Sequence, residues 1–301
     1  MRASSLNRAD RYVIEGIPLP MRLMLGLFRP RQRQLGMDFS GEVLQLGSRV
    51  TDFRVGDAVY GQQDLGKAWA EYVCVPASVV APKPENLSHV QAAAVPLAGL
   101  TALQGLRDAA ELKPGQSILI NGATGAVGTF AVQIAKALGA EVAAVCGARN
   151  VALVEQLGAD VVIPYETEDF LACGRTFDVI FDIVGNRSLL ACRKVMKRKA
   201  TFVPVGGPSG FWFGPVWALL SANVLGLFLS QRVRSFVGTP NRADLVELAA
   251  LIESGDVTPA VDREFELAEL PEAMRYLVHG RPNAKVAIRV DHGEEADVVP
   301  D

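Results

Sequence analysis

The hydrophobic pattern of the chain changes at about residue 93. From there to about residue 255, short apolar runs alternate with segments whose apolar positions recur at helical spacing. The runs predict strands at 117–121, 141–146, 161–164, 177–184 and 200–205. Helices are expected from Val127 to Gly139, near 151–157, at 188–196 and from Thr239-Pro240 to Gly255. This alternation predicts the α/β class, a doubly wound parallel sheet of Rossmann type with helices on both faces.

The segments on either side have a different texture. Residues 1–92 contain short mixed runs broken by Gly and Pro, and those at 41–47, 55–61 and 70–76 predict a strand-rich, partly open barrel. A last strand at 285–290 is expected to return to this first domain. The predicted domains are therefore 1–92 with the return segment 256–290, and 93–255 between them. The polar, acidic tail 291–301 is expected to be disordered.

Composition supports a compact protein with a small-molecule task. Half of the 301 residues are hydrophobic and 21% are charged, which excludes a disordered or coiled-coil chain. A net charge of -3 provides no basic field for nucleic acid or anionic lipid. The basic residues at 193–199 are expected to lie at a helix C-terminus, where cations favour the helix dipole.

Cysteine and histidine usage excludes two further classes. The four cysteines and three histidines are scattered, so neither a disulfide framework nor a zinc finger is expected, and the thiols are predicted to be reduced and mostly buried. No apolar leader follows Met1, so the expected location is cytoplasmic.

One segment departs from this picture. Residues 200–231 carry no charge, and 211–229 approach the roughly 20 apolar residues that span a bilayer. Gly214, Pro215 and Asn223 interrupt the run. We expect a buried loop and helix that line a pocket or a subunit interface, with a membrane span or a membrane-surface contact as the alternatives.

The strongest motif lies between the strand at 117–121 and the helix after it. Glycines in this tract let the backbone turn tightly and approach a pyrophosphate, while the helix N-terminus offers free N–H groups. The spacing Ala-x-Gly-x-x-Gly is a variant of the dinucleotide fingerprint. The predicted cofactor-binding residues here are Gly122, Ala123, Thr124, Gly125, Ala126, Val127 and Gly128.

The end of the second strand favours NADPH as the cofactor. A site for NAD(H) places an Asp or Glu there to bind the ribose 2'-hydroxyl, but the chain has Arg149 and no carboxylate in that tract. Arginine pairs with a 2'-phosphate through two parallel hydrogen bonds. The alternative is that Arg149 is only a solvated residue at the start of a helix.

The Gly-rich loop and the tracts at 36–43, 47–61, 92–102, 157–160 and 181–185 together resemble the medium-chain dehydrogenase/reductase superfamily, above all its zinc-independent quinone oxidoreductase branch. The resemblance covers residues 4 to about 290. It implies a GroES-like catalytic domain built from both chain ends, a Rossmann domain between them, an active-site cleft at their junction, and a homodimer.

The resemblance also bears on metal binding. Zinc-dependent members hold the metal with a Cys and with the His of a Gly-His-Glu tract. Here Asn7 stands at the Cys position and Met37-Asp38 replace His-Glu, so no zinc site is expected at these positions.

Site residues follow from the same resemblance. It implies that Asn7, Asp10 and Tyr12 lie beside the nicotinamide, where Asn7 and Tyr12 donate hydrogen bonds to the substrate oxygen and Asp10 either takes part or only orients its neighbours. Tyr165 is expected near the 2'-phosphate, unless it is an ordinary strand-end aromatic. Further cofactor contacts are expected from Thr101, Val184, Val205, Gly206, Gly207 and Lys285.

Two departures from the family pattern stand out. Relatives have about thirty further residues of barrel before the equivalent of Arg2, so the chain is expected either to start upstream or to lack the first strands. Relatives also commonly have Gly where this chain has Ala284.

These observations predict an NADPH-dependent, zinc-independent oxidoreductase that reduces a quinone or an α,β-unsaturated carbonyl. One alternative is a zinc-free alcohol or aldehyde oxidoreductase. Another is a truncated NADPH-binding sensor or partner protein with little turnover. Short-chain reductase, hydrolase and Walker motifs are absent from the sequence.

Overall fold

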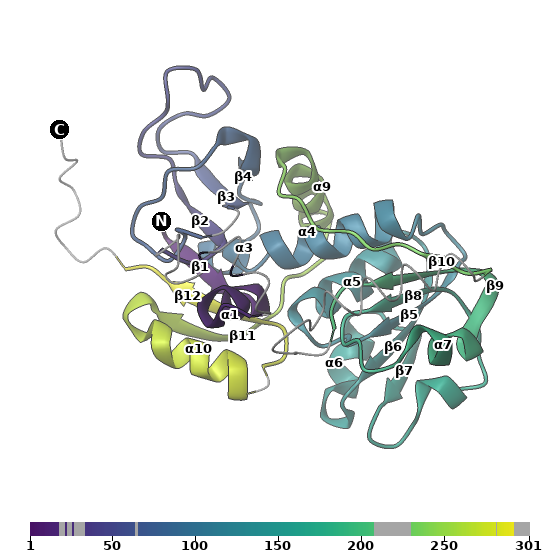
Figure 1. Cartoon of the computed structure of the whole chain (residues 1–301). Coiled ribbons are helices and arrows are strands. Elements are labelled where there is room, and N and C mark those ends of the chain that lie inside the picture. The colour runs from purple at the N-terminus through teal and green to yellow at the C-terminus, as the bar shows by residue number, and fades with distance from the viewer. Residues whose placement is uncertain are drawn as a thin grey trace.

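Two six-stranded sheets organise the chain (Figure 1). The structure is a computed structural model, and it describes residues 1–17, 22, 26, 34–63, 66–207, 230–280 and 282–291. One sheet is parallel and the other is strand-rich and mixed, so the predicted α/β class is confirmed. The exact domain boundaries stay a prediction.

The first sheet is built from both ends of the chain. Its strands, in spatial order, are β11 (Val261–Glu266), β12 (Lys285–Arg289), β1 (Ala3–Leu6), β2 (Asp38–Glu42), β3 (Ala58–Gln62) and β4 (Val80–Pro82). Strand β1 pairs antiparallel with β12, with Ala3 opposite Arg289. In Figure 1 the purple N-terminal strand therefore lies beside the yellow C-terminal strand.

The second sheet is parallel throughout. Its order is β10 (Arg232–Val233), β9 (Met196–Pro204), β8 (Phe177–Asp182), β5 (Ser117–Asn121), β6 (Glu141–Cys146) and β7 (Val161–Pro164). The strand order reverses between β5 and β8, and open α/β sheets bind ligands outside the carboxyl ends of the strands at such a switch point. The fold itself therefore predicts a ligand-binding site at the carboxyl ends of β5 and β8.

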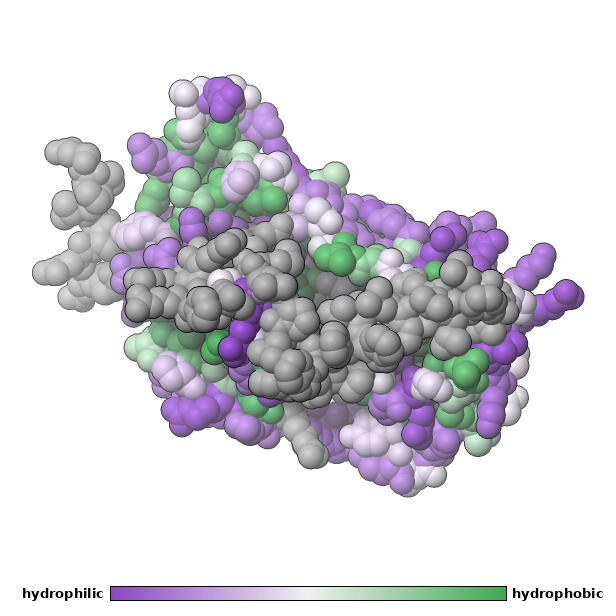
Figure 2. All heavy atoms as spheres, viewed as in Figure 1, coloured by the Kyte–Doolittle hydropathy of each residue, from purple (hydrophilic) through white to green (hydrophobic). Residues whose placement is uncertain are grey.

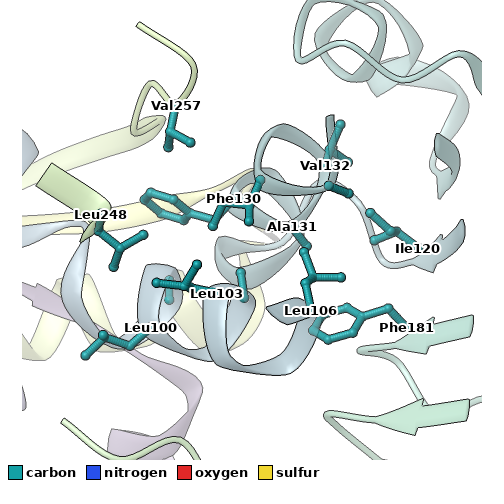
Figure 3. Close-up of a cluster of buried hydrophobic side chains, with 14 of the residues drawn as sticks. Leu100, Leu103, Leu106, Ile120, Phe130, Ala131, Val132, Phe181, Leu248 and Val257 are labelled. Carbon is teal, nitrogen blue, oxygen red and sulfur yellow. The ribbon is translucent and has the colours of Figure 1, made fainter. Parts of the chain in front are cut away.

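Helices cover both sheets and join them. They are α1 (Arg8–Glu15), α3 (His89–Ala93), α4 (Pro96–Gln104), α5 (Ala126–Ala137), α6 (Val151–Gln156), α7 (Leu189–Cys192), α9 (Arg242–Glu253) and α10 (Leu270–His279). A π-helical turn, Gly105–Ala109, continues α4. Figure 3 shows Leu100, Leu103 and Leu106 from this stretch packed with side chains of α5, β5, β8 and α9 in the largest hydrophobic core. On the outside, Figure 2 shows polar residues over much of the described surface, with apolar residues in smaller groups.

Several local predictions need correction. The segment 70–76 is not a strand, and the first of the predicted strands lies at Asp38–Glu42 rather than at 41–47. The helix expected at 188–196 is only Leu189–Cys192 with a 3-10 turn, and β9 begins at Met196. Basic residues 197–199 therefore lie on a strand, where a register shift leaves them exposed, and Lys197 pairs with Asp178.

Cysteines and the apolar segment complete the picture. All four thiols are free; Cys146 and Cys192 are buried, Cys173 is half-buried and Cys74 is exposed. Most of the uncharged segment, 208–229, and the tail 292–301 lie outside the described residues. Among the residues that are described, no helix has the length and apolar character needed to cross a bilayer.

Candidate functional site

Loops from three neighbouring strands meet at the carboxyl edge of the parallel sheet. The loop after β5 contains Gly122, whose φ of +97° favours glycine. A Cβ on Gly122 would lie 2.8 Å from the Val184 side chain in the loop after β8. The next loop is equally close, because a Cβ on Gly206 would lie 2.1 Å from the Ile183 carbonyl oxygen. The predicted cofactor residue Val184 is thus brought to the Gly-rich loop, and Val205, Gly206 and Gly207 lie against the loop after β8.

The start of α5 fits a phosphate group. Its N-cap is Gly125, which has no side chain that could accept from the N–H groups of the first turn. Among the described residues, a Cβ on Gly125 would meet one atom, the Gly122 carbonyl oxygen at 3.6 Å, so these residues leave room before the helix. A Cβ on Gly128 would lie 2.1 Å from that same oxygen, which explains why the last glycine is needed for the turn.

A buried hydrogen-bond network holds the switch point together. The Asn121 amide nitrogen, at the end of β5, donates to an oxygen of Asp182 at 2.8 Å and to Asn186 at 3.0 Å. The same Asp182 oxygen accepts from the backbone N–H groups of Gly185 and Val184. Burial raises the pKa of Asp182 above its ordinary value, against the effect of these donors. The network fixes the β8 loop beside the Gly-rich loop, a role that the sequence did not reveal.

The residues predicted to meet the adenosine lie after β6 and β7. Arg149 is exposed in the turn after β6, and the predicted Tyr165 is 62% exposed after β7. Tyr165 is fixed to β6 through its backbone N–H, which donates to the Cys146 carbonyl at 3.0 Å. Next to it, Glu166 reaches the same turn, and one of its carboxylate oxygens accepts from the Ala148 N–H at 2.9 Å.

Two of the predicted substrate-side residues, Asn7 and Asp10, lie in a buried polar cluster at the first sheet. Lys285 is completely buried, and its ammonium donates to the Asn7 amide oxygen at 2.6 Å and to an Asp38 carboxylate oxygen at 2.9 Å. That Asp38 oxygen also accepts from the Asn7 amide at 2.9 Å and from the Ser5 hydroxyl at 2.8 Å. The other Asp38 oxygen accepts from the Leu97 N–H at the start of α4. The cluster therefore fixes the orientation of the Asn7 amide.

Asp10 belongs to the same cluster. Its carboxylate accepts from the Asn7 backbone N–H at 2.7 Å and so caps the start of α1. The pKa of Asp10 is raised to about 7, chiefly by burial and in part by the nearby Asp38, while the Asn7 N–H and Lys285 act in the opposite direction. These contacts favour an orienting role for Asp10. Tyr12 is half-buried on α1, the helix that Asn7 caps.

The C-terminal return segment connects the cluster to the Gly-rich loop. The Ala284 N–H donates to the Thr124 carbonyl at 2.7 Å, and Ala284 forms a parallel bridge with Gly125. Asn283 accepts a hydrogen bond from the Asn150 amide in the turn after β6. Direct cofactor binding by Lys285 stays a prediction, but full burial favours a positioning role. The Asp38–Lys285 pair was not predicted from the sequence, where a lysine that opens the apolar strand 285–290 was its only signal.

Thr101 lies on α4, apart from this cluster. Its hydroxyl donates to the Leu97 carbonyl at 2.7 Å, and a Cβ on Gly238 would lie 3.4 Å from the Thr101 hydroxyl oxygen. The neighbouring Gln104 amide holds this same segment through both a donated and an accepted hydrogen bond with the Thr239 backbone. The contact of Thr101 with the nicotinamide stays a prediction.

Known proteins that are similar to this chain belong to one family of dehydrogenases and reductases. Residues 1–85 match the alcohol dehydrogenase GroES-like domain, and residues 157–288 match the family described as zinc-binding dehydrogenase. A 2-methylene-furan-3-one reductase from Solanum lycopersicum is 34% identical over 291 residues, which cover 90% of this chain and 68% of that protein.

Solved structures agree with this match. The quinone oxidoreductase from Coxiella burnetii is 32% identical and superimposes with a TM-score of 0.84, over 96% of this chain and 89% of that one. The Escherichia coli quinone oxidoreductase complexed with NADPH is 28% identical, with a TM-score of 0.79 over 96% and 89% of the two chains.

Proposed function

Because this chain belongs to the medium-chain dehydrogenase/reductase superfamily, we propose that it is a zinc-independent reductase that uses NADPH to reduce a quinone or an α,β-unsaturated carbonyl. One observation carries the proposal above the others. The return segment at Ala284 joins an open phosphate-type site at the start of α5 to the cluster that orients Asn7. A nucleotide held at the first would therefore lie close to donors held by the second.

When bound, the nucleotide supplies the hydride. The chain contributes donors for the negative charge that develops on the substrate oxygen. The Asn7 amide oxygen faces the Lys285 ammonium and one amide hydrogen serves Asp38, so one amide hydrogen remains for a substrate. The Tyr12 hydroxyl is the second proposed donor, and solvent provides the proton. Fixed donors of this kind stabilise an oxyanion without reorganisation.

The cluster also supports independence from zinc. Asn7 and Met37 stand where zinc-dependent members have a Cys and a His, and the Lys285 ammonium donates hydrogen bonds to Asn7 and to Asp38, the neighbour of Met37. A zinc ion at this place would have to displace a buried cation from its two partners. We therefore expect full activity after treatment with a chelator.

The first experiment is an oxidation assay of NADPH and NADH on chelator-treated protein with quinones, enones, aldehydes and ketones. Turnover of quinones or enones supports the proposed class, and turnover of aldehydes or ketones alone would favour the alcohol or aldehyde oxidoreductase. Nucleotide binding without any turnover would instead favour a sensor or partner protein. The same preparation tests the expected homodimer by light scattering.

NADPH preference is proposed from Arg149. We expect Arg149→Ala to weaken NADPH binding about tenfold or more and to leave NADH binding nearly unchanged, because NADH has no 2'-phosphate for the guanidinium to bind. Fluorescence titration with both nucleotides measures the two affinities. Equal losses for NADPH and NADH would reject the assignment of Arg149 to the 2'-phosphate.

A further inference from the structure

A carboxylate lies at the end of β6, although the sequence there contains none. Glu166 follows β7 in the chain, but its carboxylate accepts from the Ala148 N–H, 18 residues earlier, at 2.9 Å. Its other oxygen lies 3.2 Å from the position of a Cβ on Gly147, and the Tyr165 hydroxyl oxygen lies at the same distance from that position. The third strand thus delivers the acidic group that a dinucleotide site for NAD(H) carries after its second strand.

The charge of Glu166 reaches the strand end itself. Burial raises the pKa of the Cys146 thiol to about 11, and the negative charge of Glu166 is the next largest cause. Arg149 lies in the same turn, one residue after Ala148. Glu166 and Arg149, which carry opposite charges, therefore lie at the same turn, where the adenosine of a bound nucleotide is expected.

Glu166 and Arg149 favour different nucleotides, because one suits a ribose 2'-hydroxyl and the other a 2'-phosphate. A carboxylate accepts a hydrogen bond from a ribose 2'-hydroxyl, but it repels a 2'-phosphate and here also occupies a backbone N–H that a phosphate would use. We propose that Glu166 is a specificity-determining residue that opposes Arg149, so that the chain binds NADH as well as NADPH with only a small preference. The inference rests on the proposed function and concerns the same nucleotide site.

The chain offers a matched control. Glu168 is exposed in the same loop and carries the same charge, two residues beyond Glu166. Its backbone N–H bonds the Pro164 carbonyl, as part of the turn that also positions Glu166. Glu168→Gln therefore removes one charge from the loop and leaves the Ala148 contact intact. Both substitutions are at exposed positions, and thermal denaturation confirms that the variants are folded.

The test measures binding of 2',5'-ADP and 5'-AMP by calorimetry, and of NADPH and NADH by fluorescence, in wild type, Glu166→Gln and Glu168→Gln. The two adenosine probes differ only in the 2'-phosphate, and no substrate is needed. We expect Glu166→Gln to raise the affinity ratio of 2',5'-ADP to 5'-AMP, and of NADPH to NADH, about tenfold, and Glu168→Gln to change each less than about twofold. The effect of Glu166→Gln should shrink at high salt.

The outcomes separate this inference from the proposed function. If wild type binds both nucleotides but Glu166→Gln leaves the ratios unchanged, or if both variants raise them equally, the role of Glu166 is rejected and the proposed reductase stands. A wild type that already binds NADPH more than a hundredfold tighter than NADH also rejects it. If wild type binds none of the four ligands, both the inference and the proposed function fail.

Discussion

The two halves of the proposed site use polar groups in opposite ways. In the first sheet, Asn7, Asp38 and Lys285 lie within a buried cluster and bond mainly to one another. At the carboxyl edge of the parallel sheet, the glycines and the N-terminus of α5 leave backbone N–H groups without side-chain partners among the described residues. In the first half, which we call the closed half, the polar groups bond to one another. In the second, the open half, backbone N–H groups are available to a ligand.

The difference separates positioning from binding. A buried charge needs its partner, so removal of one member from the closed cluster should mainly change stability. An open helix N-terminus needs no partner for folding, so changes there should mainly affect ligand affinity.

The largest effect is expected for Lys285→Met, which leaves the Asp38 carboxylate buried without its cation. We expect the free energy of unfolding to fall by about 3–5 kcal/mol, measured by urea denaturation. The double variant Lys285→Met/Asp38→Asn removes both charges and should be more stable than the single variant. A single variant as stable as wild type would show that the pair does not hold the closed half together.

A smaller effect on stability is expected for Gly128→Ala, because its Cβ meets backbone at 2.1 Å. We expect a loss of about 1–3 kcal/mol in urea denaturation. Gly125→Ala is the matched variant: its Cβ faces open space, so stability should change by less than about 0.5 kcal/mol while NADPH binding weakens. Unchanged binding in Gly125→Ala would contradict a phosphate site at the start of α5.

Asp10 should make the closed half sensitive to pH. Its pKa is raised from 3.8 to about 7 in the folded chain, so its stabilising contribution is complete below about pH 4 and is lost as the pH rises through 7. Between pH 5 and pH 8, wild type should therefore lose about 3 kcal/mol relative to Asp10→Asn. Urea denaturation at both values measures the difference. Parallel pH profiles for the two proteins would show that Asp10 keeps an ordinary pKa.

The smallest effect concerns the segment that joins the halves. Ala284 has a φ of +71°, a conformation that favours glycine and explains the residue common in relatives. Ala284→Gly should stabilise the chain by about 0.5–1 kcal/mol. Ala287→Gly, at a regular position of β12, should destabilise it instead. Destabilisation by both changes would show that the backbone at Ala284 is not strained.

The sequence predicted the parallel sheet well for a local reason. Strands covered on both faces are continuous apolar runs, and the bounds expected at 117–121, 141–146 and 161–164 are confirmed. The segment 70–76 was wrong because alternation shows only which side chains face inward. Val73 and Val75 do pack on a hydrophobic cluster, but no strand of the described chain pairs with them.

In the candidate site, too, the features formed by neighbouring residues of the chain were predicted, and those formed by distant residues were not. The Gly-rich loop was located from the sequence because strand, turn and helix are neighbours in the chain. The Asp38–Lys285 pair joins residues 247 positions apart, and no local pattern connects them. Glu166 was not predicted because it follows the third strand in the chain, whereas in space its carboxylate lies at the end of the second strand.

The pairing of β1 with β12 has a consequence for synthesis on the ribosome. Asn7 meets Lys285 across 278 residues, so the first sheet stays incomplete until nearly the whole described chain has emerged. All strands of the parallel sheet lie between residues 117 and 233, so this sheet can form before the C-terminal segment is synthesised. During translation the edge of β1 that pairs with β12 therefore stays unpaired until the end of synthesis. Chaperones would protect this edge from aggregation during that time.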